Sequence, residues 1–285
     1  MNNYINFKRQ RELGETLTDT FKFLRQEYKG LFQALLRNAA IPFIILIAAA
    51  GYYATISADS SLFDGGIFSM ANLVLPAIIL LLAVLFYYAV MYGTVLHYIR
   101  LYIENRGVVD QDILKNEVRS QLGSLIGVTF LIALIVFFGL MLCILPGIYL
   151  AIPLSLGWAL LVFKNKPIGD VISDSFKLVK GEWWMTFATM FVLGLLLYVA
   201  NIVFSLPVII YTLVKAFTSG AEISQGNMSG LFDWVYLTLN VIASAAQYIL
   251  AVIFPIAIAF IYYNLNEKTN QTGAFETIDS IGTDR

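Results

Sequence analysis

Long apolar runs alternate with short polar stretches along the whole chain. An α-helix needs about 20 largely apolar residues to cross a bilayer, and six runs approach or exceed that length with no Asp, Glu, Lys or Arg inside them. They cover residues 39–58, 72–99, 122–143, 147–163, 184–214 and 235–263. The pattern predicts an all-α, polytopic integral membrane protein with about six transmembrane helices. We expect one membrane domain, residues 1–265, and a polar cytoplasmic tail, residues 266–285.

Alternatives remain open at two places along the chain. Runs three and four are joined by Leu145-Pro146-Gly147, which is a turn signal, and Pro153 interrupts the short fourth run. These two runs form a hairpin that either crosses fully or dips into the membrane as a re-entrant pair. The fifth run is longer than one crossing requires and contains Pro207, so it tilts, kinks near Ser205 or breaks into two segments.

Amphipathic helices precede three of the runs, at about 13–30, 109–121 and 167–181. In the first, apolar residues recur at steps of three or four from Leu13 to Leu35, with charged residues on the other faces. Beside a membrane span, such a helix belongs flat in the interface. We therefore expect cytoplasmic interfacial helices at these three places.

Two of these helices carry similar sequences. Residues 13–25 and 168–180 align without a gap, and a weaker third copy lies at 109–122. The chain therefore parses into repeated units of one interfacial helix and one hairpin. Convergence of unrelated interfacial helices is the alternative. The first two copies share four identical positions, namely Gly14/Gly169, Asp19/Asp174, Phe21/Phe176 and Lys22/Lys177.

The connections between the runs differ sharply in positive charge. Seventeen of the 18 Lys and Arg residues fall in alternate connections or the termini on one side, and Lys215 alone falls on the other. Cytoplasmic loops carry the excess of Lys and Arg. The count predicts that both termini are cytoplasmic, in a multi-pass protein of a bacterial inner membrane.

Composition narrows the chemistry. The chain is 59% hydrophobic and 13% charged with a net charge of −1, which gives no basic field for nucleic acid. Cys143 and His97 are the only cysteine and histidine, too few for a His/Cys metal site. We expect no cofactor, no metal and no catalytic residues. His97 is either a pH-responsive group or a packed or solvated side chain near the end of the second run.

Short motifs point to a family. The segments Ile144-Leu145-Pro146-Gly147-Ile148-Tyr149, 174–184 and 262–267 resemble a family of bacterial membrane proteins. It includes the membrane domain joined to some glycerophosphodiester phosphodiesterases, and poorly characterised stand-alone relatives. The resemblance implies the membrane fold over about residues 13–280. The catalytic domain of the fused forms has no counterpart in this sequence.

The polar residues inside the runs are neutral. Asn240, Ser244 and Gln247 lie on one face of the sixth run, and Asn201 and Ser205 lie one turn apart in the fifth. They form either structural hydrogen bonds between helices, for example Asn201 with Asn240, or an intramembrane polar groove.

Three functional hypotheses follow. The first is a non-enzymatic accessory or scaffold component of the bacterial envelope, with the lipid bilayer and other membrane proteins as partners. Its cytoplasmic interaction surface would comprise Asp19, Phe21, Lys22, Asp174, Phe176 and Lys177. The alternative is binding or transport of a lipid or small molecule without ion coupling, because the spans hold no ionisable group in their interiors. A membrane hydrolase is the weakest, because the sequence offers no set of nucleophile, base and orienting group.

Overall fold

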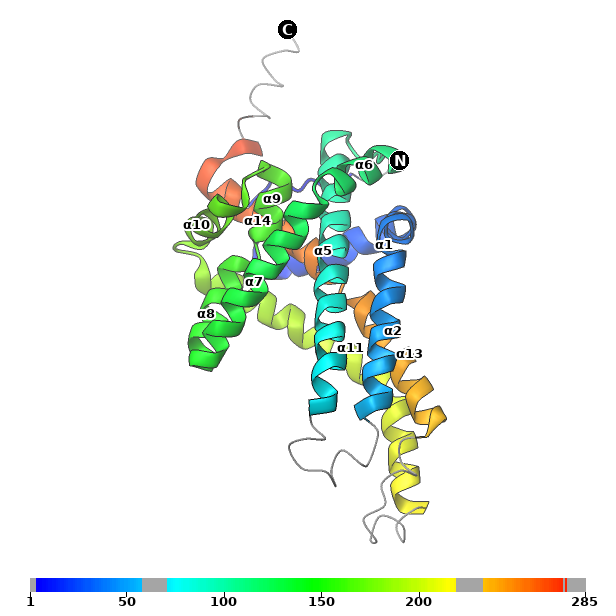
Figure 1. Cartoon of the computed structure of the whole chain (residues 1–285). Coiled ribbons are helices and arrows are strands. Elements are labelled where there is room, and N and C mark those ends of the chain that lie inside the picture. The colour runs from blue at the N-terminus through cyan, green and yellow to red at the C-terminus, as the bar shows by residue number, and fades with distance from the viewer. Residues whose placement is uncertain (1–3, 58–70, 219–232, 274, 276–285) are drawn as a thin grey trace. The chain divides into compact units, whose positions relative to one another are not determined.

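The computed structural model describes residues 4–57, 71–218, 233–273 and 275. Every regular element in these ranges is a helix (Figure 1). Six helical stretches are long and apolar enough to cross a membrane, namely 40–57, 71–104, 122–142, 144–164, 183–218 and 234–270. The prediction of an all-α polytopic membrane protein is confirmed.

The chain divides into two compact units. Unit 1 comprises residues 1–40, 88–194 and 252–285, and unit 2 comprises residues 41–87 and 195–251. The helices of unit 1 are α1 (Leu13–Asn38), α6 (Gln111–Ser120), α7 (Leu122–Leu142), α8 (Ile144–Leu154), α9 (Gly157–Lys164), α10 (Ile168–Val179) and α14 (Ile253–Asn270). Unit 2 holds α2 (Ala40–Ser57), the short η1 (Ala71–Leu73) and α13 (Trp234–Leu250). The long helices α5 (Val74–Glu104) and α11 (Trp183–Thr218) contribute residues to both.

Helix α14 is the core of unit 1. All residues from 253 to 267 except Phe254 are buried, as expected for a helix that is apolar around most of its circumference. Phe7, from the segment before α1, stacks on Phe260 with ring centroids 4.2 Å apart. Phe23 of α1 meets Phe7 edge to face at 5.3 Å. Helix α1 and the amino-terminal segment are therefore held to α14 by aromatic packing.

Helix α1 has a buried side and an exposed side. Thr16, Thr20 and Phe23 are buried within unit 1, whereas Phe21 and Tyr28 are exposed. The sequence pattern identified only one apolar side, which contains Phe21 and Tyr28. The buried side also contains two threonines, whose hydroxyls donate to carbonyls within the helix, such as Thr20 to Thr16 at 2.7 Å.

Helices α7 and α8 lie side by side as a tight hairpin (Figure 1). The chain turns at Cys143, earlier than the predicted turn at 145–147, because Pro146 and Gly147 belong to the first turn of α8. Proline is accepted there because N–H groups in the first helical turn have no partner within the helix. The fourth apolar stretch is interrupted at Ser155-Leu156, after Pro153, and continues as α9.

Two other helices extend beyond the predicted runs. Helix α11 is continuous from Trp183 to Thr218 through Pro207, although proline removes the hydrogen bond to the Val203 carbonyl. Helix α14 reaches Asn270, so the predicted boundary between domain and tail at 265/266 falls inside a helix. Asn266 and Glu267, expected in the tail, are buried.

Candidate functional site

A polar pocket of about 280 Å³ lies in unit 2, among α2, α5 and α13. It is lined by Ala50, Tyr53, Ala54, Ser57, Leu80, Tyr236, Asn240, Ser244 and Tyr248. Three tyrosines, two serines and one asparagine supply hydrogen-bond donors and acceptors, and none of the lining side chains is charged. Such a pocket suits a neutral group that carries hydroxyls.

The spacing along α13 explains the polar wall of this pocket. Tyr236, Asn240, Ser244 and Tyr248 follow one another at steps of four, and residues four apart share a helix face. The sequence prediction included Asn240 and Ser244 but added Gln247, which is exposed and does not line the pocket. The repeated step of four would have identified the two tyrosines as well.

A tyrosine pair supports the end of the pocket near Tyr248. The Tyr87 hydroxyl donates to the Tyr248 carbonyl at 3.0 Å, and the two rings meet edge to face at 6.0 Å. Phe43 of α2 packs on Tyr87 with ring centroids 5.7 Å apart. These contacts hold together α2, α5 and α13, the three helices of unit 2 that line the pocket.

Asn201 and Ser205 of α11 do not line this pocket. The Asn201 Oδ1 atom is buried and has no hydrogen-bond partner among the described residues. It therefore does not accept the hydrogen bond from Asn240 that the sequence suggested. The structure brings together Asn240 and Ser244 but leaves Asn201, Ser205 and Gln247 outside the site.

An apolar hollow of about 560 Å³ lies along α11 around Pro207. Near it, Asp233 caps the first turn of α13 by accepting from the backbone N–H of Val235 and Tyr236, both at 3.1 Å. The same carboxylate accepts from the Tyr211 hydroxyl and lies 2.9 Å from Lys215 Nζ. The hydrogen bonds from Tyr211 and Lys215 hold the pKa of Asp233 well below its ordinary value.

Lys215 and Asp233 are the only charged residues in the described part of unit 2. Lys215 is also the single Lys or Arg residue that the charge count placed on the opposite side. Because Asp233 pairs with it, the one exception to the charge asymmetry is locally neutralised.

A buried ion pair organises the amino-terminal part of unit 1. Arg11 Nε donates to Asp19 Oδ2 at 2.9 Å, and Arg9 reaches the same oxygen at 2.8 Å. Arg11 also donates to the Phe7 carbonyl at 2.7 Å, and its backbone N–H donates to Asn264 of α14 at 2.8 Å. These bonds tie the segment before α1 to both α1 and α14.

Asp19 therefore does not belong to an exposed interaction surface, and this part of the prediction is corrected. Only 8% of the residue is exposed. Burial alone would raise the pKa of its carboxyl, but the hydrogen bonds from Arg9 and Arg11 outweigh burial and lower it. The amphipathic pattern could not reveal this, because the cations come from the non-helical segment before α1.

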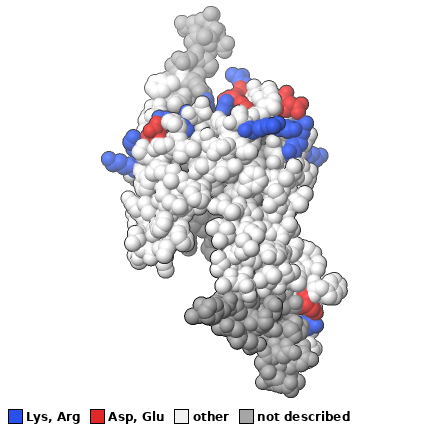
Figure 2. Space-filling model, viewed as in Figure 1, with Lys and Arg blue, Asp and Glu red and all other residues white. Residues whose placement is uncertain are grey.

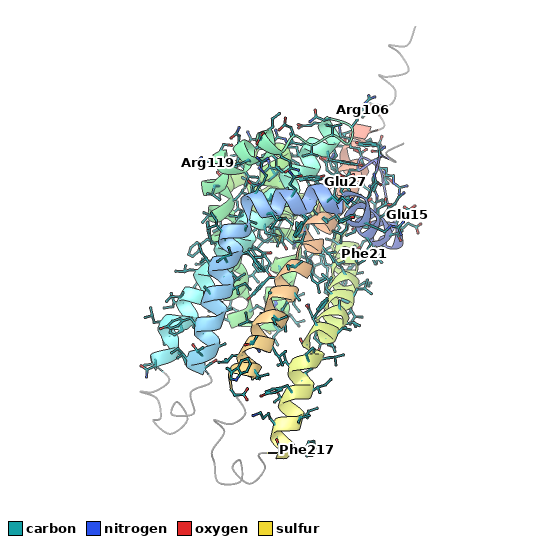
Figure 3. All side chains as sticks on the ribbon, turned by 90° about the vertical axis from the view of Figure 1, so that its right-hand side faces the viewer. Glu15, Phe21, Glu27, Arg106, Arg119 and Phe217 are labelled. Atoms are coloured by element: carbon teal, nitrogen blue, oxygen red, sulfur yellow. The ribbon has the colours of Figure 1, made fainter. Side chains whose placement is uncertain are left out.

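The other residues of the predicted surface are more accessible. Phe21, which Figure 3 labels, is exposed on α1, and so is Lys22. On α10, Lys177 is exposed and Phe176 half-buried. Asp174 accepts from Lys166 and Lys177, both at 3.1 Å, and these bonds lower the pKa of its carboxyl.

His97 is a packed side chain in the structure. It is fully buried on α5, and its Nδ1 lies 3.2 Å from Glu117 Oε2 of α6. A hydrogen bond requires a proton on Nδ1 when Glu117 is ionised. Burial raises the pKa of Glu117, and the charge of Arg100 opposes that rise. The described residues contain no group of three or more His, Cys, Asp or Glu side chains that could hold a metal ion.

Comparison with known proteins gives no relative. The chain matches no family model, no curated protein and no solved structure.

Proposed function

We propose that the protein is a non-enzymatic membrane protein that binds the polar group of a neutral lipid or similar amphiphile in the unit 2 pocket. The observation that carries the proposal is the uncharged lining of hydroxyl and amide groups around about 280 Å³. Such groups offer both donors and acceptors to hydroxyls, but no cation to compensate a phosphate.

The size of the pocket and the surface beside it fit an amphiphile. Sites for drug-sized ligands enclose about 300–1,000 Å³, so this pocket suits a small headgroup rather than a whole lipid. On α5, Leu75, Ile78 and Leu82 are exposed apolar residues close in sequence to the lining residue Leu80. Acyl chains would lie along this apolar surface while the headgroup occupies the pocket.

The pocket lining also argues against ion-coupled transport through this site. A proton- or ion-coupled transporter usually carries an ionisable group inside the membrane. The lining has no carboxylate, histidine, lysine or arginine. Binding, or facilitated movement without ion coupling, is therefore the form of activity that we propose.

Lipid retention tests the proposal directly. The protein would be reconstituted with diacylglycerol and, separately, phosphatidylglycerol, and the lipid retained after delipidation would be counted by native mass spectrometry. The double variant N240L/S244A should lose at least tenfold in diacylglycerol retention. N201L and Q247L change polar residues outside the pocket and should retain it. Equal retention by the double variant, or equal loss in the controls, would reject the pocket as the binding site.

A scaffold role is the second candidate, favoured by one surface. Phe21 and Lys22 are exposed together on α1, and Phe176 and Lys177 occupy the corresponding positions on α10. Stoichiometric co-purification of another membrane protein that is lost in F21S/K22Q would support this role. The bacterial inner membrane, the cytoplasmic termini and the resemblance to the phosphodiesterase-linked family belong to the same proposal, and rest on the charge asymmetry and the quoted motifs.

A further inference from the structure

The tip of the α7–α8 hairpin consists of apolar residues that are largely exposed. Met141, Leu142, Ile144 and Leu145 are 69%, 83%, 68% and 75% exposed, and Cys143 between them is also exposed. No Asp, Glu, Lys or Arg occurs from Ser120 to Phe163. Figure 2 shows the charged residues of unit 1 near α6 and near α10, away from the tip of the hairpin. A soluble turn would instead carry polar residues.

Two backbone hydrogen bonds stabilise the turn at the tip. The Cys143 N–H donates to the Gly139 carbonyl at 3.2 Å, and the Gly147 N–H donates to the Cys143 carbonyl at 3.3 Å. Pro146 has no N–H to satisfy. The helices also approach closely, because a Cβ on Gly139 would lie 3.1 Å from the Gly147 Cα. Unpaired backbone groups are costly in hydrocarbon, and these two bonds satisfy both the N–H and the C=O of Cys143.

The depth of the tip is limited by Trp183. Its indole stacks on Tyr149 with ring centroids 5.5 Å apart, and Nε1 donates to the Tyr149 carbonyl at 3.3 Å. Cys143 is six residues from Tyr149, so a helical rise of 1.5 Å per residue places it at most about 9 Å deeper.

Trp183 itself lies beside charged residues. Glu182 pairs with Lys268 of α14 at 2.9 Å, and Lys180 is exposed. Tryptophan prefers the membrane interface, and charged side chains avoid the bilayer centre. The level of Trp183 and Tyr149 is therefore close to a membrane surface, and the tip lies within one third of the roughly 30 Å hydrocarbon thickness below it.

Helix α10 packs against part of α7 and of α9. Ideal Cβ atoms on Gly127 of α7 and Gly157 of α9 would lie 2.9 Å from Ile168 and 3.1 Å from Val171, respectively. These contacts lie away from the tip, and α10 also carries the Asp174 and Lys177 pair. Protein contacts, rather than lipid, cover part of these apolar helices.

We propose that the α7–α8 hairpin is re-entrant and that its tip, residues 141–145, inserts into the acyl chains of the leaflet next to Trp183. Although α7 and the α8–α9 stretch are each long enough to cross a membrane, they do not reach the opposite aqueous phase. A full crossing would place four exposed apolar side chains in the far interface and draw Glu182 and Lys180 toward the hydrocarbon.

Cys143 makes the test possible without any substitution, because it is the only cysteine in the chain. A nitroxide would be attached to Cys143 in detergent, and the full-length protein reconstituted in phosphatidylcholine vesicles. Relaxation by oxygen and by a water-soluble nickel chelate then reports depth. The control C143A/S120C moves the label to the exposed end of α6.

The expected result is strong relaxation by oxygen at Cys143, with relaxation by the nickel chelate at least tenfold weaker than at position 120. Efficient relaxation of the Cys143 label by nickel would place the tip in water and overturn the proposal. Protection from both reagents, with dipolar broadening between labels, would show a second copy covering the tip and would also overturn it.

Discussion

Lys166 Nζ lies 3.1 Å from Asp174 Oδ2, eight residues further along the chain. Arg11 and Asp19 are separated by the same eight residues and pair at 2.9 Å. In the gap-free alignment of 13–25 with 168–180, Asp19 corresponds to Asp174, and the same offset carries Arg11 to Lys166. Two cations outside the aligned helices thus occupy equivalent positions and make equivalent contacts, which supports the proposed duplication.

The two pairs should differ in their importance for stability. The Arg11 side chain is fully buried and that of Asp19 nearly so, and removing one partner of a buried pair costs about 3–5 kcal/mol. We expect D19N to lower the thermal unfolding midpoint in detergent markedly. D174N should lower it much less, because its ion pair is exposed to solvent. Equal shifts in light-scattering or tryptophan-fluorescence melts would contradict this assignment.

Asp19 should also make the protein sensitive to acid. Its pKa is lower in the folded protein than in the unfolded chain, so the unfolded state binds protons more readily. The stabilisation is fully present above the unfolded value of about 3.9. It is lost as the pH falls through the lower folded value. The unfolding midpoint of the wild type should fall between pH 5 and pH 3 more steeply than that of D19N, and parallel curves would count against the pair.

Asn201 should be dispensable for folding. Its Oδ1 atom is buried without a partner among the described residues, and an unsatisfied buried polar group costs about 1–3 kcal/mol. We expect N201L to leave the unfolding midpoint unchanged or to raise it. A clear decrease would reveal a structural contact for Asn201.

The contribution of Lys215 to stability should depend on its ion pair with Asp233. D233N keeps a side-chain oxygen that can cap α13 but removes the charge opposite Lys215. D233N and K215M should each lower the unfolding midpoint, because each removes the ion pair of Lys215 with Asp233. K215M should have a smaller effect in the D233N background than in the wild type, because the pair is already lost there. Equal effects of K215M in both backgrounds would show that the two residues do not stabilise the protein as a pair.

The apolar runs predicted the helices well, because lipid-compatible helices must satisfy every backbone group internally and leave long uncharged stretches. The pattern could not locate partners contributed from outside a run. Arg11 approaches Asp19 from a non-helical segment, and the Asn201 Oδ1 atom does not accept the hydrogen bond from Asn240 that the sequence suggested. Tyr236 and Tyr248 could have been predicted from the sequence as pocket residues, because they extend the four-residue spacing of Asn240 and Ser244.

The burial of α14 has a consequence for biosynthesis. Phe7, Arg11 and α1 leave the ribosome well before the surface on which they pack, around Phe260 and Asn264, has been translated. Until then, the aromatic side chains at the amino terminus and the Arg11 guanidinium have no native partners from this helix. Unit 1 can therefore close only after α14 has been synthesised, and a nascent chain stopped before residue 253 should be an early substrate for membrane quality-control proteases.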